Sequence, residues 1–211
     1  MTVASHDKAG NEKRCVLPTG VALKDPHRQL FDAAVRVLVR DGVTGLTSRA
    51  VTTEAGVAKG VLHRHFADFD AFLVELVLDR IARVEAQATA LRDAAGTGAV
   101  VDNLTRALST LFEPVMVSIV VLVIARDELR TRLRAAGTAR FPLVGEGTAM
   151  IAGYLAVERD HRRIASDADV DVLAPTLIGA AHLLFTERKG STPEPEAVHK
   201  IVNTVLAGAL R

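Results

Sequence analysis

Residues 47–66 read TSRAVTTEAGVAKGVLHRHF, a stretch in which two short helical patterns are separated by a glycine. Thr47 is of a helix-capping residue type, and Gly56 readily adopts the positive φ of a tight turn. We therefore predict one helix over 48–55, a turn at Gly56-Val57 and a second helix over about 58–66. Two short helices joined by a glycine turn are typical of a helix-turn-helix unit.

The two predicted helices have an inner and an outer face. The apolar residues expected to face inward are Val51, Ala55, Val57, Leu62 and Phe66. The residues left on or near the outer face of the second helix are Lys59, Gly60, Val61, His63, Arg64 and His65. A helix anchored in this way can enter the DNA major groove, and Arg49 on the preceding helix can reach a phosphate or a guanine edge. From the spacing alone, an ordinary helical hairpin with solvated basic side chains explains the pattern equally well.

The segments on either side of this unit are also helical. Upstream, Asp25-Pro26 is a helix start, and the apolar stripe that follows is ended by Gly42. Residues 1–23 are polar and without periodicity, so we expect a flexible arm. Downstream, Asp68 is a candidate cap for a long amphipathic helix, whose inner face is formed by Phe72, Leu73, Leu76, Ile81, Val84 and Leu91.

The rest of the chain continues the helical period, and no strand alternation is visible. We expect one helix from Val101 to Phe112 and a nearly all-round apolar one from Val115 to about Leu133, with its first half buried. Three more are expected over the ranges Phe141 to Asp160, Asp169 to Arg188 and Pro195 to Leu210. The sequence therefore predicts an all-α fold of about nine helices.

Composition and charge narrow the range of functions. Of the 211 residues, 49% are hydrophobic and 24% charged, a balance that favours a folded core. Residues 1–66 carry ten Lys and Arg against six Asp and Glu, whereas residues 67–211 carry 16 against 19. A basic end on a mildly acidic body suggests that a polyanion binds the N-terminal third.

Cysteine usage and hydropathy bear on the location of the protein. The single Cys15 excludes an intrachain disulfide framework and a cysteine-based zinc site, and it favours a reducing cytoplasm. The longest apolar run, Val115 to Ala125, is far shorter than the roughly 20 residues that span a bilayer. We expect a cytoplasmic protein with no membrane insertion.

Sequence signatures of catalysis are missing: there is no Gly-rich phosphate loop, no G-x-S-x-G and no Cys with a catalytic partner. His63 and His65 point about 200° apart on a helix, so they cannot hold one metal ion together. His182, in an apolar run, is interpreted as a hydrogen-bonded interface residue. We predict no enzyme activity, no cofactor and no metal.

The run from Gln29 to Leu73 resembles the DNA-binding domain of the tetracycline-repressor (TetR) family of bacterial transcription regulators. The resemblance rests on Asp41-Gly42, on LTSR at 46–49, on AGVAKG at 55–60, on LHRHF at 62–66 and on Phe72-Leu73. It implies a ligand-responsive regulator, most simply a repressor, which binds a near-palindromic double-stranded DNA operator as a homodimer. The DNA-binding residues predicted in this way are Thr47, Ser48, Arg49, Lys59, Gly60, Val61, His63, Arg64 and His65.

Four positions depart from the pattern of the family. His63 stands where Tyr is typical, Ala58 where a Ser or Thr cap is typical, Phe69 where a DNA-contacting Lys is typical, and Thr52 where Ala is usual. These departures leave an alternative open: a dimeric small-molecule-binding or partner-regulating protein of the same fold that has lost specific DNA binding.

The resemblance divides the chain into the arm, a helix-turn-helix domain over residues 24–70, and an effector-binding and dimerisation domain over residues 71–211. We predict a pocket for a small apolar or aromatic effector, lined by Phe112, Met116, Ile119, Val120, Val123, Met150 and Tyr154, although plain core packing also explains these residues. Candidate polar groups there are Ser118, Arg126 and Tyr154. By resemblance, the last two helices pair with those of a second copy through Leu177, Ala181, Leu184, Phe185, Ile201 and Val205.

Overall fold

The computed structural model describes residues 25–187 and 193–211, and the predicted arm lies outside them. Within these ranges the chain forms ten helices and no strand, so the predicted all-α class is confirmed. The helices are α1 (Pro26–Gly45), α2 (Ser48–Glu54), α3 (Gly60–His65), α4 (Phe69–Asp93), α5 (Val100–Leu111), α6 (Pro114–Ala125), α7 (Asp127–Ala135), α8 (Val144–Asp160), α9 (Val170–Glu187) and α10 (Pro195–Leu206).

The N-terminal helix starts lie where the capping residues predict them. The carboxylate of Asp25 accepts the backbone N–H of Arg28 at 3.0 Å, and the hydroxyl of Thr47 accepts that of Ala50 at 3.1 Å. Each side chain satisfies a backbone donor that has no partner within its own helix. Gly42 has a φ of 70° and breaks the helical geometry inside α1, as the sequence predicts.

The single apolar helix predicted from Val115 to about Leu133 is wrong, because Arg126 is non-helical (φ −122°, ψ 104°) and divides it into α6 and α7. Two arginines hold this break. The guanidinium of Arg126 contacts Asp70 at 3.1 Å, and that of Arg130 donates to the carbonyl oxygens of Val123 and Ile124 at the end of α6. This division gives ten helices in place of nine.

The burial predicted for the first half of α6 is also wrong. Residues 115–118 are only half-buried, and Val121 and Ile124 farther along are 49% and 60% exposed. One side of α6 packs against α1, and the other borders a cavity that is described below. A helix of this composition therefore has too few neighbours to bury its whole surface.

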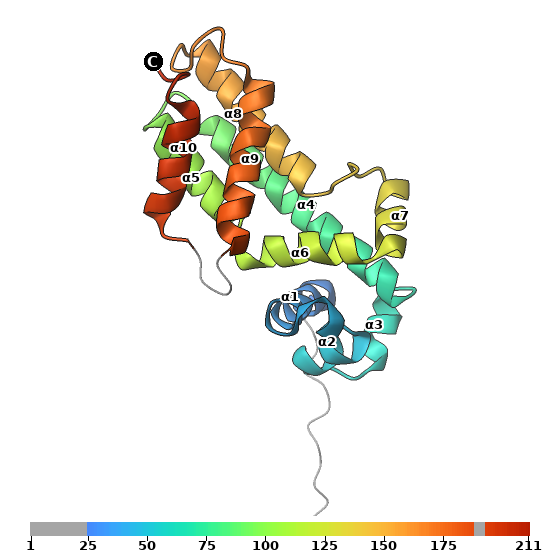
Figure 1. Ribbon diagram of the computed structural model, residues 1–211. Coiled ribbons are helices and arrows are strands. Elements are labelled where there is room, and N and C mark those ends of the chain that lie inside the picture. The colour runs from blue at the N-terminus through green and yellow to red at the C-terminus, as the bar shows by residue number, and fades with distance from the viewer. Residues whose placement is uncertain (1–24, 188–192) are drawn as a thin grey trace, which may run out of the picture.

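Figure 1 shows how the helices are arranged. Helices α1–α3 form a small unit at one end, α6 crosses above α1, and α4 leads from α3 along the length of the body. Helix α8 packs between α4 and α9, and α5 packs against α10. Helix α7 contacts α4, so the start of α4 meets the body there.

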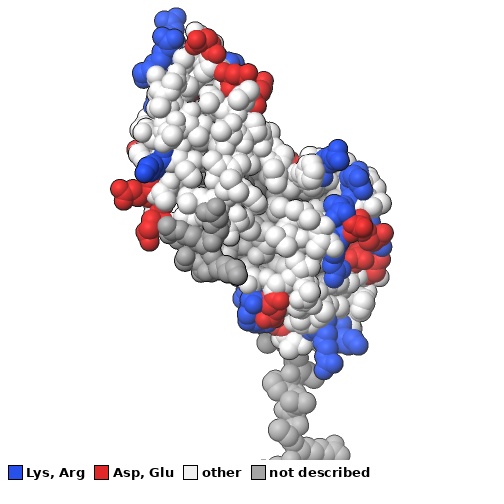
Figure 2. All heavy atoms as spheres, in the orientation of Figure 1, with Lys and Arg blue, Asp and Glu red and all other residues white. Residues whose placement is uncertain are grey.

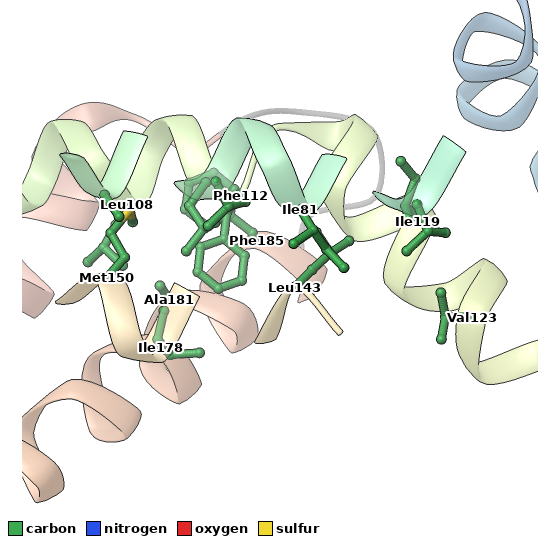
Figure 3. Close-up of a cluster of buried hydrophobic side chains, with 14 of the residues drawn as sticks. Ile81, Leu108, Phe112, Ile119, Val123, Leu143, Met150, Ile178, Ala181 and Phe185 are labelled. Atoms are coloured by element: carbon green, nitrogen blue, oxygen red, sulfur yellow. The ribbon is translucent and has the colours of Figure 1, made fainter. Parts of the chain in front are cut away.

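The core of the body consists mostly of aliphatic side chains, together with the aromatic pair Phe112 and Phe185 and the fully buried Tyr154. In Figure 3, Phe112 and Phe185 lie side by side, with ring centroids 5.4 Å apart, and Met150 and Leu108 lie close to them. No single helix of the described ranges is long and apolar enough to cross a membrane. Helices α5 and α6 reach the required length and hydropathy only when taken together, and they are bent by 55°.

Candidate nucleic-acid interface and apolar cavity

Helix α3 is anchored to the N-terminal unit by two side chains. Leu62 is fully buried and Phe66, at the end of the helix, is 3% exposed. The ring of Phe66 lies 6.1 Å from that of Phe31 on α1 and 5.0 Å from that of Phe72 on α4. Because aromatic pairs at such distances stabilise beyond their buried area, this cluster fixes α3 relative to α1 and α4.

The turn between α2 and α3 has the predicted geometry. Gly56 has a φ of 68°, a region that residues with a Cβ rarely adopt. The backbone N–H of Val57 then donates to the carbonyl oxygen of Thr52 at 3.0 Å and closes the turn. The side chain of Thr52 is buried, and its hydroxyl donates to the carbonyl oxygens of Ser48 and Arg49.

The basic side chains of this unit fall into two groups. Two of the three arginines of α1 are paired: Arg36 contacts Glu54 at 2.7 Å, and Arg40 contacts both Glu54 and Asp41 at 2.8 Å. The hydrogen bonds from Arg36 and Arg40, the former being the larger effect, hold the pKa of Glu54 below its usual value. These pairs neutralise the charge of the second half of α1 and leave Arg28 at its start unpaired among the described residues.

The second group lies on α2 and α3. Arg49, Lys59 and Arg64 are exposed, and none of them contacts a carboxylate within 4.0 Å among the described residues. The three cations therefore keep their full charge on the helix-turn-helix. An anionic partner would meet this charge without first breaking an ion pair.

The other residues predicted to contact DNA differ in exposure. Thr47, Gly60, His63 and His65 are exposed, whereas Ser48 and Val61 are half-buried. The ring of His65 lies 5.4 Å from that of His27 at the start of α1. The predicted set therefore gathers on α2 and α3, with His65 at the edge next to α1.

The departures at Ala58 and Phe69 have visible consequences. Helix α3 begins at Gly60 with Lys59 as its N-cap, and no side chain caps it. The ring of Phe69 is stacked on that of Phe72, with centroids 5.7 Å apart. The guanidinium of Arg126, at the junction of α6 and α7, lies 5.6 Å from the centroid of the Phe69 ring. Phe69 therefore joins the start of α4 to the body.

Two ion pairs strengthen this junction. Arg132 on α7 contacts both carboxylate oxygens of Asp68 at 2.9 and 3.0 Å, and Arg126 contacts Asp70. Asp68 also caps α4 by accepting the backbone N–H of Ala71 at 2.6 Å. The hydrogen bond from the Ala71 N–H, and to a smaller extent the one from Arg132, lowers the pKa of Asp68. The segment just after α3 is thus tied to α7.

The body contains an apolar cavity of about 280 Å³ between α5, α6, α8 and α9. Its lining consists of Leu111, Phe112, Met116, Val117, Val120, Ile124, Leu143, Val144, Ile178, Gly179 and His182. Phe112, Met116 and Val120 belong to the predicted pocket. His182 lines the cavity too, although the sequence suggested an interface role. The feature of the sequence that could have pointed to His182 as a cavity residue is its polar ring within an apolar run.

The structure places the remaining predicted pocket residues elsewhere. Ile119 is fully buried, Val123 lines a neighbouring cavity, and Met150 lines a separate hollow against α4 and α5. Of the candidate polar groups, Ser118 donates its hydroxyl to the carbonyl of Pro114 in its own helix, and Arg126 is engaged at the junction. The apolar cavity is therefore lined by part of the predicted set.

Tyr154 is fully buried in a polar network. Its hydroxyl donates to Glu158 at 2.5 Å and accepts from Asn103 at 3.0 Å, and Glu158 is itself 3.4 Å from Arg163. Burial, and then the bond to Glu158, raise the pKa of Tyr154. The contacts of this tyrosine link α5 and α8, and it does not line the apolar cavity.

The predicted dimer residues also divide by burial. Leu177, Ala181 and Phe185 are buried within the protomer, whereas Leu184, Ile201 and Val205 are half-buried. The exposed apolar side chains of α9 are instead Val172 and Leu183, at 57% and 61%. Figure 2 shows a broad, largely uncharged surface on this side of the molecule.

The family model described as bacterial regulatory proteins, tetR family, matches residues 30–76. No curated protein sequence matches the chain.

Three of the solved structures that share the fold have low sequence identity. The fatty acid degradation regulator FadR from Bacillus halodurans has a TM-score of 0.67 at 18% identity, covering 90% of this chain and 99% of its own. FadR from Bacillus subtilis in complex with stearoyl-CoA has a TM-score of 0.60 at 16% identity, covering 86% and 96%. A TetR transcriptional regulator from Agrobacterium tumefaciens has a TM-score of 0.55 at 19% identity, covering 88% and 94%.

Proposed function

We propose that this chain, whose residues 30–76 match the model of bacterial regulatory proteins of the tetR family, is a DNA-binding, ligand-responsive transcriptional repressor. It binds a near-palindromic operator as a homodimer and leaves the operator when a small effector binds the body. Since the operator is chromosomal DNA, the protein acts in the cytoplasm.

The observation that carries this proposal is the unpaired positive charge of Arg49, Lys59 and Arg64. Arg36 and Arg40 of α1 have carboxylate partners and Arg28 has none, so three of the four unpaired Lys and Arg side chains of the described residues 25–66 lie on the helix-turn-helix. Contacts to phosphates provide most of the affinity for DNA, and contacts to base edges provide the specificity. We assign the phosphate contacts to Lys59 and Arg64, and a base or phosphate contact to Arg49.

The proposed dimer uses the exposed side of α9 together with α10. Val172 and Leu183 lie about three helical turns apart on α9 and are both exposed, at 57% and 61%. They leave an apolar strip on which a second helix can pack. Two copies related by a two-fold axis would read half-sites about 34–36 Å apart, one turn of DNA.

The proposed effector site is the apolar cavity. The stearoyl-CoA complex of Bacillus subtilis FadR supports a small-molecule site in a body of this fold. Helix α6 lines the cavity with Met116 and Val120 and packs against α1, so a ligand beside α6 acts close to the DNA-binding unit. A ligand shifts the equilibrium between a DNA-binding and a non-binding arrangement of the protein only as far as it binds one more tightly than the other. A tenfold loss of DNA affinity requires about 1.4 kcal/mol of coupling free energy between the two sites.

The alternative is a protein of the same fold without specific DNA binding. The observations in its favour are the uncapped start of α3 and the position of Phe69 against Arg126. A missing N-cap destabilises a helix by about 0.5–2 kcal/mol, and a phenylalanine supplies no phosphate contact.

Selection from random duplex DNA tests the proposal. The full-length protein is expected to enrich a near-palindrome, and its affinity should fall steeply with salt. Lys59→Ala and Arg64→Ala should each reduce the slope of log K against log salt by about 0.9. Arg49→Ala should cost about 1–3 kcal/mol if it reads a guanine.

The matched control is Arg106→Ala, since this arginine of α5 is exposed and lies outside the helix-turn-helix. It should leave both affinity and salt slope unchanged. Failure of the folded dimer to enrich any sequence would favour the alternative function.

A further inference from the structure

A second cavity adjoins the apolar one. It measures about 480 Å³ and shares Val120, Ile124 and Val144 with its neighbour. Its other lining residues come from α6, from α7 and from the segment between α7 and α8, namely Val123, Arg130, Arg134, Arg140, Phe141 and Pro142. The two cavities therefore lie side by side, with these three side chains bordering both, and their chemistry differs.

The second cavity is basic. Three arginines line it and no acidic residue does. Arg130 is committed to Asp127 and to the carbonyl oxygens that end α6. Arg134 and Arg140 are exposed, and neither contacts a carboxylate within 4.0 Å in the part of the chain that the structure describes.

Arg134 and Arg140 differ from the neighbouring arginines, which have carboxylate partners. Arg132, two residues before Arg134 on α7, is held by both Asp68 and Glu128, and Arg126 is held by Asp70. Figure 2 shows acidic and basic side chains intermingled over α7. Acidic partners are thus available in this region, yet Arg134 and Arg140 have none.

The aromatic and backbone features at the boundary fit a ligand with two parts. Phe141 is 58% exposed, and the guanidinium of Arg140 lies 5.6 Å from the centroid of its ring. Leu143, which lines the apolar cavity, has a φ of 71°, a region that is rare for residues other than glycine. Non-glycine residues in this conformation are found preferentially at ligand sites.

We propose that the effector is an amphipathic anion. Its apolar chain occupies the cavity beside Phe112 and Met116, and its negatively charged head is held by Arg134 and Arg140. Guanidinium groups bind carboxylates and phosphates through strong, charge-assisted hydrogen bonds. The shared chemistry is therefore a long apolar chain with a terminal carboxylate or phosphate group. This inference rests on the proposed function, because it names the class of molecule that releases the DNA.

The test compares ligands of equal chain length that differ in the head. Dodecanoate, dodecanol, dodecylamine and dodecanoyl-CoA are titrated into the full-length protein by calorimetry, below their critical micelle concentrations. We expect the two anions to bind about tenfold or more tightly than the alcohol and the amine. Tight binding of dodecanoyl-CoA alone identifies phosphates as the head, whereas tight binding of both anions shows that a carboxylate suffices.

The same titrations are made with Arg134→Gln/Arg140→Gln and with Arg106→Gln, an exposed arginine outside the lining of both cavities. The double variant should lose about tenfold or more in affinity for the anions and retain its affinity for dodecanol. The control should match the wild type. Thermal melting verifies that each variant is folded.

The effect on DNA separates the two proposals. If dodecanol binds the wild type as tightly as both anions do, or if the double variant binds the anions as tightly as the wild type does, the anionic effector is wrong. Release of the selected duplex by dodecanol would then still support an effector-responsive repressor. If none of the four ligands binds, the amphipathic effector is wrong, and the DNA selection alone decides the proposed function.

Discussion

The substitution Leu62→Ala removes a buried anchor of α3 and leaves its exposed side chains in place. It therefore distinguishes the stability of α3 from the contacts that α3 makes with DNA. Leu62 is the one residue of α3 that is fully buried, and the helix has six residues and no side-chain cap. Helices this short are unstable in isolation, so α3 depends on its anchors. Leu62→Ala in a packed core costs about 2–5 kcal/mol, and the lower bound corresponds to about a 30-fold change in an equilibrium constant.

Hydrogen exchange measures this loss directly. The amides of α2 and α3 should exchange about 30-fold faster or more in Leu62→Ala, while those of the body keep their protection. DNA affinity should fall because a smaller fraction of the protein is competent to bind. The salt slope should stay that of the wild type, because Lys59 and Arg64 still meet the phosphates in the bound state.

The control for Leu62→Ala is His63→Ala, which changes an exposed neighbour on the same helix. It should weaken DNA binding with no change in exchange, because it removes a contact and no buried volume. If Leu62→Ala leaves exchange within about threefold of the wild type, the anchoring argument is refuted, since about 2 kcal/mol demands a larger change.

Three further outcomes are expected. Tyr154→Phe removes a buried hydrogen bond to Glu158, worth about 1.5–3 kcal/mol, and should lower the melting temperature by roughly 3–12 °C without altering DNA contacts. Because the folded state lowers the pKa of Asp68, its carboxylate stabilises the protein above the ordinary value of 3.8 and loses this effect as the pH falls. The difference in melting temperature between wild type and Asp68→Asn should therefore shrink in acid, and a constant difference would show that Arg132 and the cap contribute nothing. Leu183→Glu should yield a folded monomer in sedimentation that no longer binds the operator, and an intact dimer would exclude this face.

The N-terminal unit could be predicted from the sequence because its determinants are local. Asp25 and Thr47 cap helices through backbone groups three residues away, and Gly56 takes its positive φ within the turn itself. Each feature depends on residue type and on short spacing. The match of the family model to residues 30–76 covers the same part of the chain.

Two of the features that were missed depend on distant partners. The break at Arg126 is held in part by Asp70, 56 positions earlier in the chain, and no local pattern contains that pairing. Tyr154 looked like a polar group of a pocket, yet Asn103, 51 positions away, helps to hold it in the core. The basic cavity was missed for a different reason: Arg134 and Arg140 are close in the sequence, but the segment between α7 and α8 that brings both to the cavity beside α6 has no regular period.

Helix α6 is a rod with a break at each end, and this has a mechanical consequence. It begins at Pro114, which has no backbone N–H, and ends at the non-helical Arg126. The side chain of Ser118 donates only to its own helix, so among the described residues α6 makes no side-chain hydrogen bond of its own to a neighbour. The side-chain hydrogen bonds that α6 receives from α7 come from Arg130, to the carbonyl oxygens of Val123 and Ile124 at its last turn, so the rest of the rod is positioned by packing volume. A bulkier residue at Val120, such as Phe, should act as a permanent occupant and leave the protein unresponsive to added ligand.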